Sequence, residues 1–283
     1  MEDPRELLRS ILDLAGGHPG VHAVVQTGSR ARGDRVDRYS DLDIELIGPG
    51  TGELVGQEGW LRSIEPTLVA LHLANEAEDA PDWPTCLAVF EGGRKVDFTL
   101  AGTERLTRMV REGLDPLYRR GYRVLLDPYG LARGLPEPVP GPPPWHPPTA
   151  GEFRDGQTTF WFEATQVPVY LARRDLWHAQ LRLAEMREQL LTLLEWNARA
   201  RSSGAVDTWH LGHHVDSWTP AAYREALPSV FPGYHRDEMS DALRAATGLY
   251  ATVAEETAHL LDLPLLPLHA PVSRHVRRVL GEA

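Results

Sequence analysis

The sequence predicts an α+β protein, in which a domain with a mixed β-sheet flanked by helices precedes a helical bundle. Three observations carry this prediction. Short apolar runs that alternate with polar residues fill the first half and are typical of strands. Apolar residues recur at helical spacing through the second half. Between the halves, residues 136–148 hold eight prolines in thirteen positions, which is typical of a stiff connector. We therefore expect domains at 1–135 and 151–283, joined by a proline-rich linker at 136–150.

The composition is that of a globular protein with an acidic surface. Its 283 residues are enough for two modest domains, and 42% of them are apolar. No apolar run approaches a membrane span, and the first residues do not resemble a signal peptide. A single cysteine, Cys86, excludes an internal disulfide and a cysteine-based zinc cluster. We expect a cytoplasmic location and no membrane partner.

The formal net charge of −11 bears on the partners of the protein. General nucleic-acid binders usually present a basic surface, so no nucleic-acid partner is expected. The same negative charge is compatible with a cationic small-molecule substrate.

The first domain is expected to begin with an amphipathic helix at residues 4–15. Leu7, Leu8 and Ile11 share one face of this helix, and Gly16-Gly17 follows it. The other elements follow from alternating apolar runs, glycine turns and capping residues. They are strands at 21–25, 41–47, 68–73, 87–90, 95–100 and 122–126, and helices at 57–64 and 103–113.

The second domain is expected to consist of long helices whose apolar stripes pack together. Residues 183–194 and 243–261 mark two of them. Phe160-Trp161-Phe162 belongs to an earlier helix, which we expect to be interrupted or kinked at Pro168. The tryptophans and tyrosines of this half are expected mostly in the core, although some of them could line a sugar-binding cleft.

The stretch that carries chemistry is the Gly28-Ser29 turn, followed by Asp41 and Asp43. Because side chains alternate along a strand, Asp41 and Asp43 share a face with Glu45 and lie roughly 7 Å apart along the chain. Two carboxylates this close repel each other unless a cation lies between them, and Mg²⁺ prefers oxygen ligands. The glycine and the hydroxyl of the turn suit a phosphate. An ordinary turn before an exposed acidic strand is the plainer interpretation.

Asp97 lies on the returning strand of a predicted hairpin, where Val96 and Phe98 point to the opposite face. A carboxylate set among buried neighbours calls for a compensating cation. Together with Asp41 and Asp43, it would complete a metal-binding triad. A satisfied residue at a sheet edge is the alternative.

A histidine-rich segment, residues 209–214, is a weaker candidate for a metal site. Histidine pairs bind zinc when their geometry agrees, but no cysteine or matching acidic spacing accompanies this segment. We expect a loop with surface histidines here.

Metal-binding acids beside a phosphate-binding turn, with no obvious covalent nucleophile, favour nucleotidyl transfer. In this chemistry metal ions bridge the acids and the triphosphate, activate the acceptor hydroxyl and stabilise the leaving pyrophosphate. A nearby carboxylate can take the proton of the acceptor.

These residues carry a resemblance to a known family. Gly28-Ser29, Asp41-x-Asp43 and Asp97 are similar to the nucleotidyltransferase superfamily related to DNA polymerase beta. Within it, the chain most resembles the aminoglycoside 6-adenylyltransferases, which modify streptomycin. The closer resemblance rests on residues 94–100, Leu125-Leu126-Asp127, Phe153, Phe160-Trp161, Leu176-Trp177 and residues 272–279.

The resemblance implies a nucleotidyltransferase domain at residues 1–135 and a substrate-binding role for the helical domain. It implies that Ser29 and Arg30, next to Gly28, hold the triphosphate of ATP. Arg174 lies where the family has a lysine, so it keeps the charge and would help to hold phosphate.

The same resemblance assigns the acids. Asp41 and Asp43 would bind Mg²⁺, and Asp97 would be a further metal ligand, the general base, or both. All three are therefore expected to be catalytic.

Several positions depart from the family. Thr158-Thr159 stand where the family has Asn-Glu, residues 178–180 lack its acidic pair, and Glu185 replaces a lysine. If the lost acids faced the drug, the cationic acceptor would differ from streptomycin. If the lost lysine touched the triphosphate, nucleotide binding would be weaker. Glu163, Asp155 and Glu185 are candidate substitutes that contact the substrate, and a solvated helical face is the alternative for each.

Together these observations predict Mg²⁺-dependent transfer of AMP from ATP to a hydroxyl of an aminoglycoside-like molecule. Other acceptors stay open, namely a lincosamide-like drug, another metabolite or a protein side chain. A homologue that binds a nucleotide or a drug without turnover is an alternative of a different class. The three clustered acids disfavour it, because a pure binder has no need of them.

Overall fold

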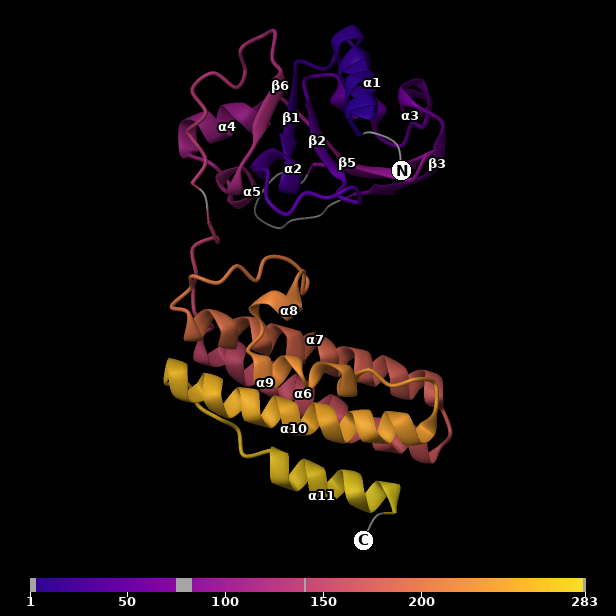
Figure 1. Ribbon diagram of the computed structural model, residues 1–283, viewed down its shortest axis with the longest axis vertical. Helices are drawn as coiled ribbons and strands as arrows, with labels where there is room; N and C mark the ends of the chain where they lie inside the picture. Colours follow the sequence, from indigo (N-terminus) through magenta and orange to yellow (C-terminus); the bar gives the residue numbers. More distant parts are fainter. Residues whose placement is uncertain (1–3, 75–82, 140, 282–283) are drawn as a thin grey trace. The chain divides into compact units, whose positions relative to one another are not determined.

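The protein forms two compact units, residues 1–140 and 141–283 (Figure 1). Its computed structural model describes residues 4–74, 83–139 and 141–281. The first unit contains a β-sheet and the second is helical, so the α+β class expected from the sequence is confirmed. The division between the units falls inside the proline-rich segment.

The first unit is built on a six-stranded mixed sheet with the order β3-β4-β5-β2-β1-β6. β2 and β5 pair in parallel, and the other neighbouring strands pair antiparallel. The strands are β1 (Ala23–Thr27), β2 (Leu42–Ile47), β3 (Thr67–Leu73), β4 (Thr85–Phe90), β5 (Arg94–Ala101) and β6 (Arg123–Leu126). All the strands expected from the sequence form, with small shifts at their ends.

Two apolar cores cover the two faces of this sheet. On one face, Leu42, Ile44 and Leu46 of β2 pack with buried side chains of α1 (Pro4–Gly17) and α3 (Gly59–Ile64). On the other face, Leu106 of α4 (Glu104–Glu112) and Tyr118 of α5 (Pro116–Arg120) belong to a smaller core. The acids of β2 alternate with its apolar residues, so they point toward the smaller core.

Four short stretches differ from or add to the predicted helices of this unit. Helix α1 continues through the glycine pair that was expected to stop it. Thr103 precedes α4 as expected, but its side chain makes no capping hydrogen bond. Helix α2 (Gly28–Arg32) and a 3-10 turn at Thr51–Leu54 were not predicted.

Glu45 is a buried carboxylate that the structure neutralises inside the first unit. Its side chain is only 2% exposed, and Arg105 donates to both carboxylate oxygens at 3.1 and 3.0 Å. The hydroxyl of Tyr118 donates to the same carboxylate at 2.7 Å. Glu45 therefore has three hydrogen bonds from α4 and α5, and it ties these helices to the central strand β2.

The second unit packs long helices around one apolar core. Its helices are α6 (Ala150–Ala172), α7 (Leu176–Arg201), α8 (Val215–Trp218), α9 (Ala221–Arg224), α10 (Arg236–Leu261) and α11 (His269–Leu280), with a 3-10 turn at Leu227–Val230. Phe160 stacks on Tyr250 with ring centroids 3.6 Å apart, which joins α6 to α10 in this core. Among the described residues, no helix is long and apolar enough to cross a bilayer.

The expectation that Pro168 interrupts its helix was wrong. Helix α6 is not interrupted at Pro168 but continues to Ala172. Pro168 is buried, and Val167 and Leu171 beside it are part of the core. The packing of this apolar face offsets the backbone hydrogen bond that a proline cannot donate.

The Glu45 cluster leads to a test of stability. Tyr118→Phe should lower the free energy of unfolding by about 1.5–3 kcal/mol, because a buried carboxylate loses one of its donors. Urea denaturation of the full chain, followed by a probe in the first unit, measures the change. Tyr122→Phe is the matched control, since its hydroxyl donates to the carbonyl of Pro136 at an exposed position, 3.0 Å away. Its loss should stay below about 1 kcal/mol, and equal losses in the two variants would contradict this account of Glu45.

Candidate active site

The structure brings Asp41, Asp43 and Asp97 together although 54 residues separate Asp43 from Asp97. Asp43 in β2 and Asp97 in β5 are direct partners in the parallel pair, and Asp41 lies just before β2. One carboxylate oxygen from each of the three lies within 4.8 Å of the others. The strand alternation and the parallel pairing together place these oxygens on one face of the sheet.

Lys95 lies between two of these carboxylates. Its Nζ donates to Asp41 Oδ2 at 3.1 Å and to Asp97 Oδ2 at 2.8 Å. Reasoning from the sequence missed this lysine. The signal was available, because Lys95 precedes Asp97 by two residues on one strand, and such residues share a face.

Asp43 has the least compensated charge of the three acids. Burial, together with the nearby charges of Asp41 and Asp97, raises its pKa to about 6, although the charges of Lys95 and Arg32 oppose this change. Burial also raises the pKa of Asp97, although the hydrogen bond from Lys95 opposes the change. The site therefore holds more negative charge than its own cations balance, which is the condition that favours binding of an added cation.

The donor set fits a hard divalent cation. All the donors are carboxylate oxygens, which Mg²⁺ prefers. Asp97 Oδ1 is buried and has no hydrogen-bond partner among the described residues, so one ligand atom is left without compensation. These three acids are the only group of this size in the described part of the chain that could hold a metal ion.

Gly28 is required where β1 ends and α2 begins. Its φ is +69°, which favours glycine, and an added Cβ would lie 1.8 Å from Asp43 Oδ2. The backbone of the Gly28-Ser29 turn therefore approaches the carboxylate of Asp43 closely. The predicted phosphate-binding turn lies directly beside the acids.

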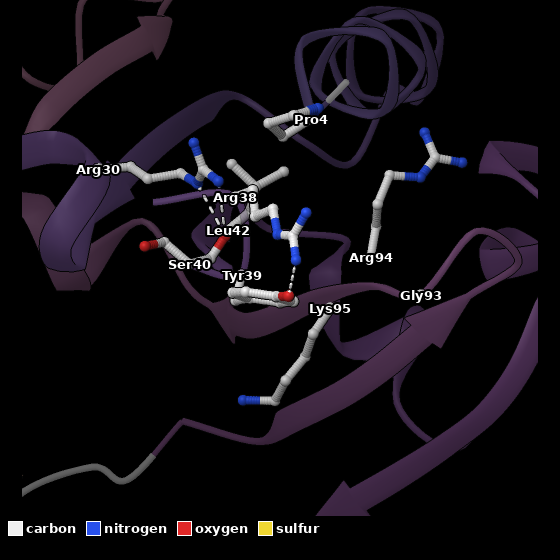
Figure 2. Close-up of a pocket in the computed structure, with 9 residues that line it drawn as sticks. All are labelled: Pro4, Arg30, Arg38, Tyr39, Ser40, Leu42, Gly93, Arg94 and Lys95. Carbon is white, nitrogen blue, oxygen red and sulfur yellow. Dashed lines mark hydrogen bonds between the residues drawn. The ribbon is translucent and has the colours of Figure 1, made fainter. Parts of the chain in front are cut away.

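Arg30 is engaged differently from the expectation that it holds phosphate. Its guanidinium donates to the backbone carbonyls of Asp37, Ser40 and Asp41, at distances from 2.7 to 3.2 Å. Figure 2 shows Arg30 reaching across to Ser40. These bonds hold the loop that carries Asp41. Ser29 is partly exposed in α2, and its carbonyl accepts the N–H of Asp34 at 3.3 Å.

The remaining site predictions lie in the second unit. Arg174 is exposed between α6 and α7, with a φ of +61°. Asp155 on α6 and Glu185 on α7 are exposed, as a ligand for a cationic group would be. Glu163 is buried at 7% exposure, and Arg182 donates to both of its oxygens at 3.2 Å. Glu163 therefore already has a cationic partner in a buried position, whereas Asp155 has only an exposed, 4.0 Å contact with Arg154.

The histidine-rich segment does not form a metal site in the described structure. Residues 210–214 make turns that lead into α8, and the rings of His210 and His213 lie 6.3 Å apart. No metal-ligating set among the described residues includes them. The expectation of a histidine loop is confirmed.

Comparisons with known proteins identify a family over nearly the whole length. The family model described as Streptomycin adenylyltransferase matches residues 1–278. Among curated proteins, no match to the chain was found. Among solved structures, the chain is similar to an aminoglycoside 6-adenyltransferase from Bacillus subtilis, with 17% identity, 99% of each chain covered and a TM-score of 0.47. It is also similar to a nucleotidyltransferase-like protein from Exiguobacterium sibiricum, with 8% identity, a TM-score of 0.33, and coverage of 99% of this chain and 88% of that one.

The raised pKa of Asp43 predicts how stability depends on pH. Between its ordinary value of 3.8 and about 6, the folded chain keeps a proton that the unfolded chain releases. Stability therefore falls as the pH rises through this window. At pH 8 and without divalent ions, Asp43→Asn should raise the free energy of unfolding by about 1–3 kcal/mol, and below about pH 4 it should change little. Urea denaturation at both pH values measures this, and a gain independent of pH would argue against the prediction.

The close approach of Gly28 predicts a specific loss of metal binding. Gly28→Ala should weaken Mn²⁺ binding by about tenfold or more, because the new methyl group displaces the carboxylate of Asp43. Gly33→Ala is the matched control, since Gly33 has a φ of +68° and open space around its Cβ position. Gly33→Ala has the same conformational strain from a positive φ, but its methyl group meets no neighbouring atom. Electron paramagnetic resonance of Mn²⁺ measures both, and similar losses would mean that backbone strain alone is responsible.

Proposed function

The chain belongs to the streptomycin adenylyltransferase family, and from this premise we propose a Mg²⁺-dependent transfer of AMP from ATP to a hydroxyl of an aminoglycoside-like acceptor. Membership makes the protein a nucleotidyltransferase with ATP as the implied co-substrate. The dependence on Mg²⁺, the acceptor and the roles of individual residues are the proposed part.

The observation that carries the proposal is the cluster of Asp41, Asp43 and Asp97. Three carboxylates held within 4.8 Å on one face of the sheet repel one another, and this repulsion favours an added cation. The unpartnered Asp97 Oδ1 and the raised pKa of Asp43 support a site adapted to an added cation.

The reaction forms one bond and breaks another at the α-phosphorus of ATP. The acceptor hydroxyl attacks this phosphorus, the new O–P bond forms, and the bond to the β-phosphate oxygen breaks to release pyrophosphate. A carboxylate takes the hydroxyl proton. We assign this step to Asp97, because its Oδ1 has no hydrogen-bond partner among the described residues.

The metal and the phosphates would be held by residues of the first unit. Asp41 and Asp43, with Asp97, would hold Mg²⁺, which supplies charge stabilisation for the reacting phosphates when bound. Gly28 and Ser29 would place backbone and hydroxyl donors near the triphosphate. Arg30 would act mainly by fixing the loop that carries Asp41. Arg174 is proposed as a further phosphate contact.

A cationic acceptor is supported by charge. The chain carries a net charge of −11, and Asp155 and Glu185 are exposed on the helical unit. Glu163 is a weaker candidate for contact with amines, since Arg182 already pairs with it. A different hydroxyl-bearing acceptor would use the same chemistry, so the experiment below includes several classes.

The helical unit also contains an apolar cavity, which bears on where an acceptor could bind. α7 and the loops before α8 and α10 line an apolar cavity that includes Leu191, Leu211 and Phe231. None of the acids proposed to contact substrate lines it. An aminoglycoside is polar, so we do not place its amines in this cavity.

The proposal is tested by pyrophosphate release from ATP in the presence of Mg²⁺ and a panel of acceptors. The panel comprises streptomycin, other aminoglycosides and a lincosamide. We expect release with at least one aminoglycoside, and Asp97→Asn or Asp43→Asn should lower kcat/KM by at least about 100-fold.

Glu112→Gln is the matched control for this test, because it removes an exposed carboxylate of α4 that pairs with Arg108. It should leave the rate unchanged. Release with only a non-aminoglycoside acceptor would replace the proposed substrate class. Tight binding of ATP without release under any acceptor would favour a binding protein.

A further inference from the structure

Lys95 is unusual in the sequence as well as in the site. It is the only lysine among the 29 lysine and arginine residues of the chain. Wherever else the protein uses a permanently positive side chain, it uses arginine. The single exception stands between Asp41 and Asp97, where the proposed metal would bind.

The two cations differ in a way that matters at this position. An arginine guanidinium is planar, broad and suited to bidentate pairing, whereas a lysine ammonium is a compact point charge on a flexible stem. The ammonium of Lys95 touches one oxygen of each of two carboxylates, as a small metal ion does. It therefore resembles the expected metal in size, charge sign and ligands.

The surroundings of Lys95 allow its ammonium to move away from Asp41 and Asp97. Its side chain is 42% exposed, compared with 34% for Asp41 and 27% for Asp97. Figure 2 shows that it extends away from Arg94, its neighbour in β5. The only hydrogen bonds found for its ammonium among the described residues are those to Asp41 and Asp97. Among the hydrogen bonds of the described residues, only these two part-buried ones have to be broken when the ammonium turns toward solvent.

We propose that Lys95 is a resident counter-ion of the metal-free site and that the divalent ion displaces it from Asp41 and Asp97. This inference rests on the proposed metal site. The metal and the ammonium would lie against the same carboxylates, and two positive charges that close repel each other, so binding of the metal disfavours the lysine contact.

The proposal has a consequence for nucleotide binding. The displaced ammonium remains on the face of the sheet that carries the acids, and a lysine is a suitable point charge for phosphate. A metal ion that arrives with a triphosphate brings a new anionic partner for Lys95, whereas a metal ion alone does not. The site should therefore bind the metal alone weakly and the metal–nucleotide complex better.

The test is the affinity for Mn²⁺ alone, measured by electron paramagnetic resonance on the full chain. Lys95→Met keeps the length of the side chain and removes its charge, and it should tighten Mn²⁺ binding by about tenfold or more. Lys95→Arg keeps the charge, so its affinity should not exceed that of the wild type. Arg62→Gln removes one positive charge from an exposed position on α3 and should leave the affinity unchanged.

The thermal midpoint of unfolding is a second measurement, and it shows whether Lys95→Met has lost stability. Without its lysine the metal-free site has uncompensated acids, so Lys95→Met should have a lower thermal midpoint than the wild type. Added Mn²⁺ should then raise that midpoint more in Lys95→Met than in the wild type.

The outcomes separate this inference from the proposed function. Equal or weaker Mn²⁺ binding in Lys95→Met, with binding still abolished by Asp43→Asn, would overturn the counter-ion role alone. Tighter binding in both Lys95→Met and Lys95→Arg would also overturn it, since charge would not be the cause. Absence of Mn²⁺ binding in every form, including the wild type with ATP, would overturn the metal site and this inference together.

Discussion

Repulsion among carboxylates on one face of the sheet is the constraint around which the first unit is arranged. Asp41 lies just before β2, Asp43 and Glu45 follow on that strand, and Asp97 lies beside Asp43 on β5. Each carboxylate favours a counter-charge, which Arg105 supplies to Glu45 and Lys95 supplies to both Asp41 and Asp97. Along the strand, the counter-charge changes from a buried arginine, which stays in place, to a lysine that we propose a metal ion displaces.

At the inner end, Glu45 accepts hydrogen bonds from Arg105 and Tyr118, and these bonds hold α4 and α5 against the sheet. At the outer end, Asp41 and Asp97 share the partly exposed ammonium of Lys95. Asp43 stands between these ends, and the described structure shows no hydrogen bond to its carboxylate. The same row of acids thus passes from a structural ion pair to a site adapted to a metal within a few residues.

Much of this arrangement could be predicted because strand alternation is a strict rule. It placed Asp41, Asp43 and Glu45 on one face, and the paired glycines at 92–93 marked the hairpin that carries Asp97. The same rule places Lys95 on the face of Asp97, but a lysine in a strand usually indicates an exposed position, so the pattern alone does not assign it to the site. The acid that gains a buried arginine partner is selected by the positions of α4 and α5. Those positions result from tertiary packing, which no local sequence pattern encodes. For the same reason the sequence did not predict the bond of Glu163 to Arg182 or the continuous path of α6 through Pro168.

The pairing of Asp43 with Asp97 across parallel strands has one more consequence. Lys95 and Asp97 belong to the same strand, so a one-residue slip of β5 would carry both to the opposite side of the sheet. A deletion or insertion in the hairpin could not remove the acid and leave the ammonium behind. Ligand and counter-ion therefore move as a single unit, and an error in the alignment of β5 would remove both from the site and leave only Asp41 and Asp43 on that face.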